Sequence, residues 1–421
     1  MEILIRSARI HDTGSPFNNQ VKDILIVDGK IKKIGARLQN TTKAKEIKQD
    51  NLHVSLGWVD MNTFLADPGY EQKETIESGS RAAAFGGFTH ICCLPNTAPV
   101  TQTKAQIEYV LGKASAGIVA VHPLGAVTQN CEGKDLAEMY DMYQAGAIAF
   151  TDGLKPSASA GLVERALLYV KAFDGLIINH PEDKSISKNG AMHEGITSTR
   201  MGLPGAPALA EEVAVNRDIY VLEYTGSRLH FMGVSLKRSV DLVRAAKKKG
   251  LNLTASVNAY NLLLDDSAIA GYNTDYKVNP HLRAKEDINA LIKGITDGTI
   301  DTITSAHNPQ DEECKKLEFD KADFGMLGLE TCYAVANTAL SGKVETGKLV
   351  ELLSNNARAI LGLENKIVEG AEADLTLFDP EMKWTFKESD IQSRSKNTPF
   401  IGQQFTGKAV GVINKGKLQL N

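Results

Sequence analysis

Four side chains of the types that transfer protons or bind metal ions lie close to short apolar runs of the sequence: Asp152, His180, His230 and His307. Histidine and aspartate in such places can serve as general bases or as metal ligands. A single imidazole cannot build a zinc site, because such an ion usually takes three or four protein ligands. An aspartate before a glycine is also typical of a turn or a helix cap. Each of the four residues therefore has a structural interpretation beside the chemical one.

The segment from Gly57 to Gly69 places three further side chains together. Asn62, Phe64 and Ala66 alternate along it. Alternate residues of a strand point to the same face, so these three side chains are expected to point together. A phenyl ring offers no lone pair and a methyl group offers no charge. Of these three side chains, only the amide of Asn62 is polar.

The elements that position these residues follow a repeating pattern from about 56 to 364. The predicted strands span 89–94, 147–150, 176–179, 220–222, 253–257 and 302–304. The predicted helices span 74–85, 134–144, 162–173, 208–216, 236–249 and 287–297. Strands that alternate with helices of this length imply parallel pairing through right-handed crossovers. The pattern predicts an α/β fold, a (β/α)8 barrel of the TIM type, with a doubly wound open sheet as the structural alternative.

Both chain ends have the pattern of short strands instead. The predicted strands there span 3–10, 23–27, 30–34, 373–379 and 407–417. The turn Val27-Asp28-Gly29-Lys30 is a strong hairpin signal, because Asp-Gly suits the turn that joins two adjacent strands. We expect residues 1–55 and 365–421 to form one small β-sandwich domain, and residues 56–364 to form the barrel.

Several motifs, in this order along nearly the whole chain, resemble those of the dihydroorotases, which belong to the amidohydrolase superfamily. The segment 57–69 resembles the metal-binding strand of that family, which reads G-[FW]-[IV]-D-x-H-x-H-x-R-D-P-G. The other matching segments are 94–100, 180–183, 201–207, 278–283, 324–331, 356–358, 369–375 and 395–400. Together these motifs indicate common ancestry and the barrel fold, but ancestry does not settle function.

The resemblance implies a centre with two zinc ions in active members of the family. A metal-bound hydroxide attacks the ring amide of dihydroorotate there, and an aspartate transfers the proton. In this chain Asn62 and Phe64 stand where paired histidines hold zinc, and Ala66 stands where an arginine binds the substrate carboxylate. Gly233 replaces a later histidine ligand, and Ala306 replaces the catalytic aspartate. The chain is therefore identified as a degenerate member that lacks most of the metal ligands.

Two family ligand positions keep a residue that can bind metal, because Asp152 stands at the bridging position and His180 at a ligand position. His230 matches a histidine that is not the principal ligand of its motif. Two close cations need several anionic or imidazole groups to offset their repulsion. We therefore expect no metal and no cofactor, and zinc only if the chain has a non-standard site.

Substrate recognition is only partly lost by the same comparison. Asn96 and Asn279 match positions that bind dihydroorotate in the family. Both lie beside a proline, where asparagine is also common in turns. The absence of an arginine at Ala66 removes the two charge-assisted hydrogen bonds that would hold the carboxylate. Tight binding of dihydroorotate is therefore not expected.

The composition is that of an ordinary globular protein, with 421 residues, 43% of them hydrophobic and 23% charged. The formal net charge of -4 gives no broad attraction to nucleic acid or to an anionic membrane. No run of about 18 apolar residues indicates a membrane span. Five cysteines without zinc-ribbon spacing suit a reducing, cytoplasmic setting: Cys92, Cys93, Cys131, Cys314 and Cys332.

These observations support three hypotheses. The first is a dihydroorotase-like pseudoenzyme of pyrimidine biosynthesis with a structural or regulatory role. By analogy with family relatives that have lost their ligands, it would form a hetero-oligomer with aspartate transcarbamoylase, and a homo-oligomer is also expected. The second is an active dihydroorotase or related cyclic amidohydrolase, of hydantoinase or allantoinase type, that uses Asp152, His180, His230 and His307. The third is a small-molecule binding protein that uses Asn96 and Asn279.

Overall fold

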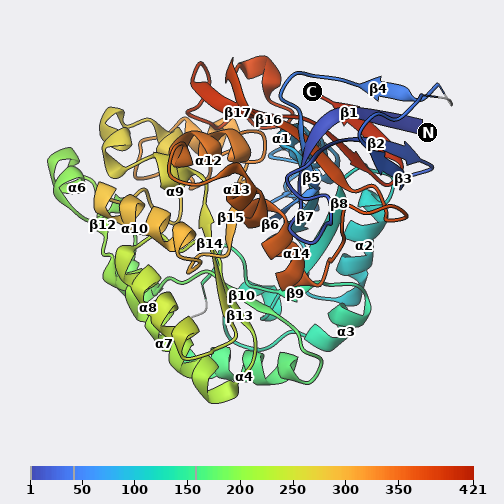
Figure 1. The fold of residues 1–421 in the computed structure, drawn as a ribbon. Coiled ribbons are helices and arrows are strands. Elements are labelled where there is room, and N and C mark those ends of the chain that lie inside the picture. The colour runs from blue at the N-terminus through green and yellow to red at the C-terminus, as the bar shows by residue number, and fades with distance from the viewer. Residues whose placement is uncertain (1, 41–42, 157–158) are drawn as a thin grey trace.

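The computed structural model describes residues 2–40, 43–156 and 159–421. Figure 1 shows a barrel of strands surrounded by helices, and beside it a β-sheet that contains both chain ends. No helix in the described ranges is long and apolar enough to cross a membrane.

The barrel contains eight strands, of which β8 (Ala120–Gly125) has no counterpart among the predicted strands. Its strands are β6 (Trp58–Thr63), β7 (Phe88–Cys93), β8 (Ala120–Gly125), β9 (Ala149–Phe150), β10 (Ile177–Asn179), β13 (Leu229–Phe231), β14 (Leu253–Asn258) and β15 (Thr302–Thr304). They pair in chain order and in parallel. A parallel bridge between Thr63 and His307 joins the end of the first strand to the segment after the last. The predicted barrel is confirmed, since a doubly wound sheet would reverse its strand order.

Helices surround these strands (Figure 1). The longer ones are α1 (Ile76–Gly86), α2 (Lys104–Ala114), α3 (Met139–Gln144), α4 (Ala160–Lys171), α7 (Leu209–Thr225), α8 (Lys237–Lys248), α10 (Lys285–Thr296), α12 (Cys332–Leu340), α13 (Thr346–Leu353) and α14 (Asn355–Leu361). Shorter ones are α5 (Lys184–Ser187), α6 (Ile196–Met201), α9 (Tyr260–Leu263) and α11 (Glu312–Lys315). The hydroxyl of Thr75 caps α1 by accepting from the amide of Ser78, and Gly87 ends it with φ +93°.

The strand predicted at 220–222 is wrong. These residues lie inside α7, and the strand of that repeat is β13. Tyrosine and valine favour strands, but Val215, Ile219 and Leu222 recur at helical spacing and all are buried. Burial of that helical face overrides the local preference. The helix continues to Gly226, whose φ of +59° ends it.

The two chain ends pair in one sheet, as predicted. Its strands are β1 (Glu2–His11), β2 (Val21–Val27), β3 (Lys30–Gly35), β4 (Lys45–Ile47), β5 (His53–Leu56), β16 (Leu375–Thr385), β17 (Gln404–Asn414) and β18 (Lys417–Leu420). The antiparallel pair β5 and β16 joins the N-terminal strands to the C-terminal ones. Asp28 and Gly29 both have positive φ in the predicted hairpin. The domain limits at residues 55 and 365 stay a prediction.

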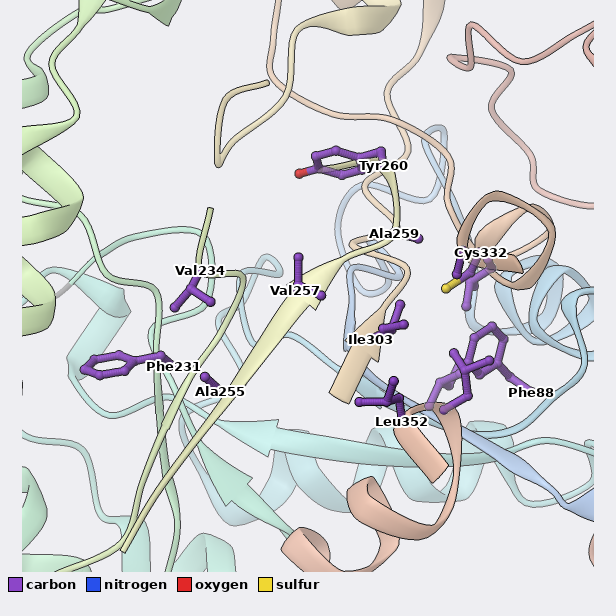
Figure 2. Packing of buried hydrophobic residues seen from close by; sticks show 14 of the residues in the cluster. Phe88, Phe231, Val234, Ala255, Val257, Ala259, Tyr260, Ile303, Cys332 and Leu352 are labelled. Atoms are coloured by element: carbon purple, nitrogen blue, oxygen red, sulfur yellow. The ribbon is translucent and has the colours of Figure 1, made fainter. Parts of the chain in front are cut away.

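Three apolar clusters hold the fold together. The largest lies between the barrel strands and their helices, where Phe88, Phe231, Val257 and Ile303 are fully buried (Figure 2). A second lies within the β-sheet domain. The third, called the interior cluster below, consists of Val59, Met61, Phe64, Ala66, Cys92, Leu94, Leu124, Ala149, Leu176, Ile178, Met232, Ala357 and Leu361.

A buried ion pair joins the barrel helices to the β-sheet domain. Arg358 of α14 donates to the carboxylate of Asp374 and to the carbonyl of Gly57, at 2.8 Å from Nη2 and 3.1 Å from Nε. His90 Nε2 lies 2.8 Å from the same carboxylate. The side chains of Arg358 and Asp374 are 4% and 8% exposed. Neither charge therefore has water to replace a lost partner.

We expect Arg358→Ala to lower the free energy of unfolding by about 3 to 5 kcal/mol, because it leaves the carboxylate of Asp374 buried without its cation. Urea unfolding followed by circular dichroism measures the change. The control is Arg81→Ala, which removes an exposed pair with Glu77. That variant should lose less than about 0.5 kcal/mol. Similar losses in the two variants would contradict the role given to Arg358.

Candidate functional site

A cavity of about 240 Å³ opens at the carboxyl ends of the barrel strands, where TIM barrels carry their reactive groups. It is lined by Asn62, Leu154, His180, Lys184, Met232, Asn279, Pro280, Asn308, Gln310, Asp323 and Phe324. Of the residues singled out in the sequence, Asn62, His180 and Asn279 therefore meet in one place. Polar amides and apolar side chains, rather than a cluster of carboxylates and imidazoles, make up most of its wall.

Asn62 lies in the first barrel strand, β6, whereas Phe64 and Ala66 lie in the segment that follows it. Asn62 is 7% exposed, lines the cavity beside Met232, and has no hydrogen-bond partner among the described residues. Phe64 and Ala66 belong to the interior cluster, which also contains Met232. The part of the barrel interior that adjoins the cavity is therefore packed with apolar groups.

The backbone at three of the altered positions has left-handed torsion angles. The φ angles are +58° at Ala66, +74° at Gly233 and +47° at Ala306. Residues other than glycine rarely adopt this region, and such strain is typical of functional sites. A Cβ atom at Gly233 would lie 3.1 Å from Asn258 Nδ2. A metal-binding side chain at this position would therefore meet both strain and crowding.

The carboxylate of Asp152 accepts three hydrogen bonds from Val127 and Thr128. Its Oδ1 accepts from the amides of Val127 and Thr128 at 3.0 and 2.9 Å, and its Oδ2 accepts from the Thr128 hydroxyl at 2.6 Å. Burial raises the pKa of Asp152, although these hydrogen bonds oppose the rise. The residue stabilises the segment after β8, and its lone pairs are directed at that segment.

His180 has one acidic neighbour. Its Nε2 lies 3.6 Å from Glu182 Oε2, and its Nδ1 lies 3.5 Å from the carbonyl oxygen of Met232. Glu182 also accepts from Lys184 Nζ at 2.8 Å. Burial alone would raise the pKa of Glu182, but His180 and Lys184 hold it well below its usual range. Glu182 is therefore a buried anion with its own cation.

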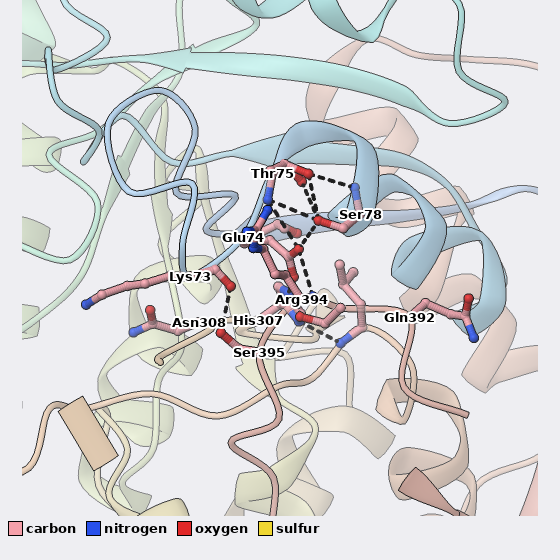
Figure 3. A network of polar contacts seen from close by, with 12 residues as sticks. Lys73, Glu74, Thr75, Ser78, His307, Asn308, Gln392, Arg394 and Ser395 are labelled. Atoms are coloured by element: carbon pink, nitrogen blue, oxygen red, sulfur yellow. Dashed lines mark hydrogen bonds and ion pairs between the residues drawn. The ribbon is translucent and has the colours of Figure 1, made fainter. Parts of the chain in front are cut away.

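His307 is part of a fully buried network that connects three distant segments (Figure 3). Its Nδ1 accepts from the amides of Gly328 and Leu329 at 3.2 and 3.4 Å. The other ring nitrogen therefore carries the proton, and Nε2 donates to Glu74 at 3.3 Å. Glu74 also accepts from the hydroxyl of Ser393. The His307 ring has no contact with solvent.

His230 faces the barrel strands. Its Nδ1 lies 2.8 Å from the Thr254 hydroxyl, and its Nε2 is buried without a partner among the described residues. Burial lowers the pKa of His230 to about 3. The imidazole is therefore neutral at physiological pH.

The residues present do not fit a two-zinc site. No group of three or more His, Cys, Asp or Glu side chains in the described part of the chain is arranged to hold a metal ion. Of the four groups considered for a non-standard site, only His180 lines the cavity. Asp152, His230 and His307 are each hydrogen-bonded elsewhere. The structure therefore does not bring the four together.

The two asparagines differ in their surroundings. Asn96 donates to the carbonyl of Asp152 at 2.9 Å and accepts from the amide of Leu154 at 2.9 Å. It holds a turn and does not line the cavity. Asn279 lines the cavity and donates to Glu182 at 2.9 Å, which leaves its amide oxygen free to accept.

Sequence reasoning missed three residues of the site: Glu182, Lys184 and Met232. Glu182 lies in a motif that was matched, two residues after His180, so a carboxylate at that distance was a usable signal. Met232 lies two residues after His230. In an extended segment such residues point to the same face, so this spacing was also a usable signal. No local signal indicates that Lys184 pairs with Glu182 at the cavity wall.

Comparisons with known proteins agree with the fold and the motifs. A family model described as Dihydro-orotase-like matches residues 53–239. A dihydroorotase of Pelotomaculum thermopropionicum is 42% identical over 423 residues, which cover 99% of this chain and 98% of that protein. A dihydroorotase of Geotalea daltonii is 40% identical over 421 residues, which cover 99% of each.

Solved structures of hydantoinases have the same fold. The L-hydantoinase (dihydropyrimidinase) of Arthrobacter aurescens has a TM-score of 0.88 at 24% identity, covering 99% of this chain and 95% of that one. A D-hydantoinase has a TM-score of 0.85 at 23% identity, covering 100% and 95%. At these identities the likeness concerns architecture: a barrel with a β-sandwich domain.

We expect the buried His230 to make the protein less stable as the pH falls. Its pKa is about 3 in the folded chain and about 6.5 in the unfolded chain, so between these values the unfolded state binds more protons. Its share of stability therefore falls by about 1.4 kcal/mol per pH unit below pH 6.5. Urea unfolding of the native protein and His230→Gln across pH 7 to 5 should show a steeper slope for the native protein. Thr254→Val, which keeps the imidazole, should retain the native slope; equal slopes for all three would contradict a buried neutral ring.

Proposed function

The chain belongs to the dihydroorotase family, and from that premise we propose that it is a dihydroorotase-like protein of pyrimidine biosynthesis that no longer hydrolyses a ring amide. The donor set at the barrel mouth carries this proposal. Asn62, Phe64 and Gly233 offer one amide, one phenyl ring and bare backbone at the family's ligand positions.

The surroundings of Asp152, His180 and Ala306 support the proposal that the hydrolytic step is lost. In the family, hydroxide forms at neutral pH because a bound metal lowers the pKa of water. Asp152 directs its lone pairs at backbone amides, and His180 has a single anionic neighbour. Ala306 has no proton to transfer. These residues supply neither the nucleophile nor the proton carrier, so we derive no catalytic step.

The charges around the cavity support weak binding of dihydroorotate. Lys184 pairs with Glu182 at 2.8 Å, and Lys73 lies 3.5 Å from Asp323. The substrate carboxylate would compete with these pairs, since Ala66 offers no cation of its own. The side-chain amide of Asn62 lines the cavity and could bind a ligand there. The third hypothesis, a small-molecule binding protein, therefore stays a prediction.

Turnover and metal content test the loss of activity. We expect the purified protein in added zinc to show no ring opening of dihydroorotate or of a hydantoin, and to hold no zinc by elemental analysis after desalting. The control is the fivefold variant Asn62→His, Phe64→His, Ala66→Arg, Gly233→His and Ala306→Asp, which should gain some zinc because it restores the family's groups. A companion variant carries the other four substitutions and keeps Gly233. It shows whether a failure to bind zinc comes from crowding between residue 233 and Asn258.

Two outcomes would contradict this proposal. About one or two tightly bound zinc ions per chain with measurable ring opening in the native protein would establish an enzyme. A fivefold variant that folds and still binds no zinc would mean that the family motifs have been matched to the wrong residues.

A structural or regulatory role is the function that remains for an inactive barrel. We propose that the protein works in the cytoplasm and assembles with aspartate transcarbamoylase. Its net charge of -4 favours proteins and small molecules over nucleic acid and membranes as partners. Such an assembly would require the fold but not the hydrolytic reaction.

Purification of the untagged protein from its native extract at low salt tests the partner. We expect transcarbamoylase activity to elute with the protein in gel filtration, ahead of the position of the isolated chain. Prior removal of the protein with an antibody is the control and should remove that early peak. Recovery of the protein without transcarbamoylase activity would argue against this partner.

A further inference from the structure

The inner face of the barrel carries two histidines near the amino-terminal ends of its strands. His90 of β7 and His122 of β8 alternate with Cys92 and Leu124, which belong to the interior cluster. Alternate residues of a strand point to the same face, so both imidazoles point into the barrel. Their ring centroids lie 5.1 Å apart, and their planes differ by 4°. The two rings therefore form a parallel pair at the end of the barrel opposite Asn62.

Hydrogen bonds give this pair a direction. The carboxylate of Asp374 accepts from His90 Nε2 at 2.8 Å, so the His90 proton is on Nε2. His90 Nδ1 is then the acceptor in its 2.8 Å contact with His122 Nε2. Burial is the main cause that lowers the pKa of His122 to about 3, so this ring is neutral at physiological pH and carries one proton. His122 therefore keeps a lone pair on Nδ1, which has no partner among the described residues.

His122 forms part of the wall of a second cavity, of about 690 Å³, called the amino-end cavity below. Its other walls come from the segments before β9, β10 and β13 and from the end of α14. Leu176 and Leu361 of this wall belong to the interior cluster, as does Met232 of the cavity at the carboxyl ends. The interior cluster therefore separates the two cavities. A volume of several hundred Å³ suits a small molecule.

One wall of the amino-end cavity is aromatic. It contains Tyr143 and Phe173, whose ring centroids lie 4.8 Å apart. Phe173 also packs edge-on against the buried Phe150, at 6.0 Å between centroids, so its position is fixed from the core. Rings of this kind bind the flat face or the edge of another aromatic ring.

Arg228 supplies a cation to the same cavity. Its Nη1 donates to the carbonyl and the carboxylate of Asp174 at 2.9 and 3.1 Å, and its Nη2 donates to the carbonyl of Ile360 at 2.8 Å. Its Nε has no partner among the described residues. The side chain of Asp174 is 83% exposed, so water screens this ion pair. The guanidinium therefore keeps a donor for a carboxylate, the anion that it binds best.

The strand order sets the distance between the two polar groups. His122 lies in β8 and Arg228 directly precedes β13, and β9 and β10 lie between these strands. Neighbouring strands are about 4.8 Å apart, so three steps place the two backbones about 14 Å apart along the barrel wall. The arginine side chain spans part of that distance. A ligand that reaches both groups therefore carries its donor and its anionic group on opposite edges.

We propose that the amino-end cavity binds an aromatic carboxylate whose ring carries an O–H or N–H group on the edge opposite the carboxylate. The O–H or N–H group donates to His122 Nδ1, and the carboxylate accepts from Arg228. The ring packs against Tyr143 and Phe173. Asp374 and His90 are positioning residues, because they direct the lone pair of His122 into the cavity. The site lies away from the barrel mouth, so this inference stands independently of the proposed function.

Three probes of similar shape test the proposed contacts by titration calorimetry. We expect 4-hydroxybenzoate to bind the native protein with a Kd of about 1 mM or lower. 4-Methylbenzoate keeps the shape and the charge but has no O–H donor, and it should bind about tenfold more weakly. 4-Hydroxybenzamide keeps the donor but has no charge, and it should also bind about tenfold more weakly.

Variants of the protein test where the probes bind. His122→Phe keeps a planar ring without an acceptor, so it should bind 4-hydroxybenzoate and 4-methylbenzoate equally. A general distortion of the cavity would weaken both and leave the preference. Ala359→Trp, at an exposed position of α14 in the cavity wall, should abolish binding. The matched control is Ala245→Trp, at an exposed position of α8 outside the cavity, which should bind as the native protein does. Circular dichroism checks that each variant is folded.

Four results would overturn the proposal. Titration of the native protein with 4-hydroxybenzoate without saturation would mean that the cavity is not a site for this class of ligand. Equal affinity of the native protein for the two benzoates would remove the role of the His122 lone pair. A preference for the O–H group that persists in His122→Phe would assign that contact to another residue. Binding that is unchanged in Ala359→Trp would place the ligand elsewhere on the protein.

Discussion

Closure of the barrel at its mouth depends on hydrogen bonds between the first strand and the segment after the last. The amide of Phe64 donates to the carbonyl of His307 at 2.8 Å. Asp60, which is fully buried, accepts from the amide and the hydroxyl of Ser305, both at 2.7 Å. Burial raises the pKa of Asp60, so these donors are needed to keep its carboxyl group satisfied. The protein thus links its barrel ends through its own side chains, and this link requires no metal ion.

The same linkage explains why the surviving polar residues are poor candidates for catalysis. Asp152 holds the segment after β8, and His307 holds Glu74 against the chain near Ser393. A group whose lone pairs and protons are all engaged within the fold has none to offer a substrate. Of these histidine and aspartate residues, His180 is the one that lines the cavity, beside Lys184, Asp323 and the amides of Asn62 and Asn279. The barrel fold and the positions of these side chains are thus set by the same hydrogen bonds.

The backbone at Ala66, Gly233 and Ala306 has left-handed torsion angles. Such torsion angles persist only where the surrounding structure enforces them. Here the segments after the barrel strands hold them in place: the Gly233 amide, for example, donates to the Ser256 hydroxyl at 3.0 Å.

The sequence by itself determined the barrel, the sheet formed by both chain ends and the hairpin at Asp28-Gly29, because hydrophobic periodicity and turn residues act over short distances. The family motifs also identified Asn62, His180 and Asn279, which the structure brings together at the cavity. The false strand at 220–222 shows the limit of local preference. Only the tertiary structure decided that Asp152 accepts from backbone amides, that Glu182 contacts Asn279 at the cavity wall, and that Glu74 meets Ser393 from far along the chain. Hydrogen bonds between remote segments depend on how the elements pack, and no local pattern of residues encodes that packing.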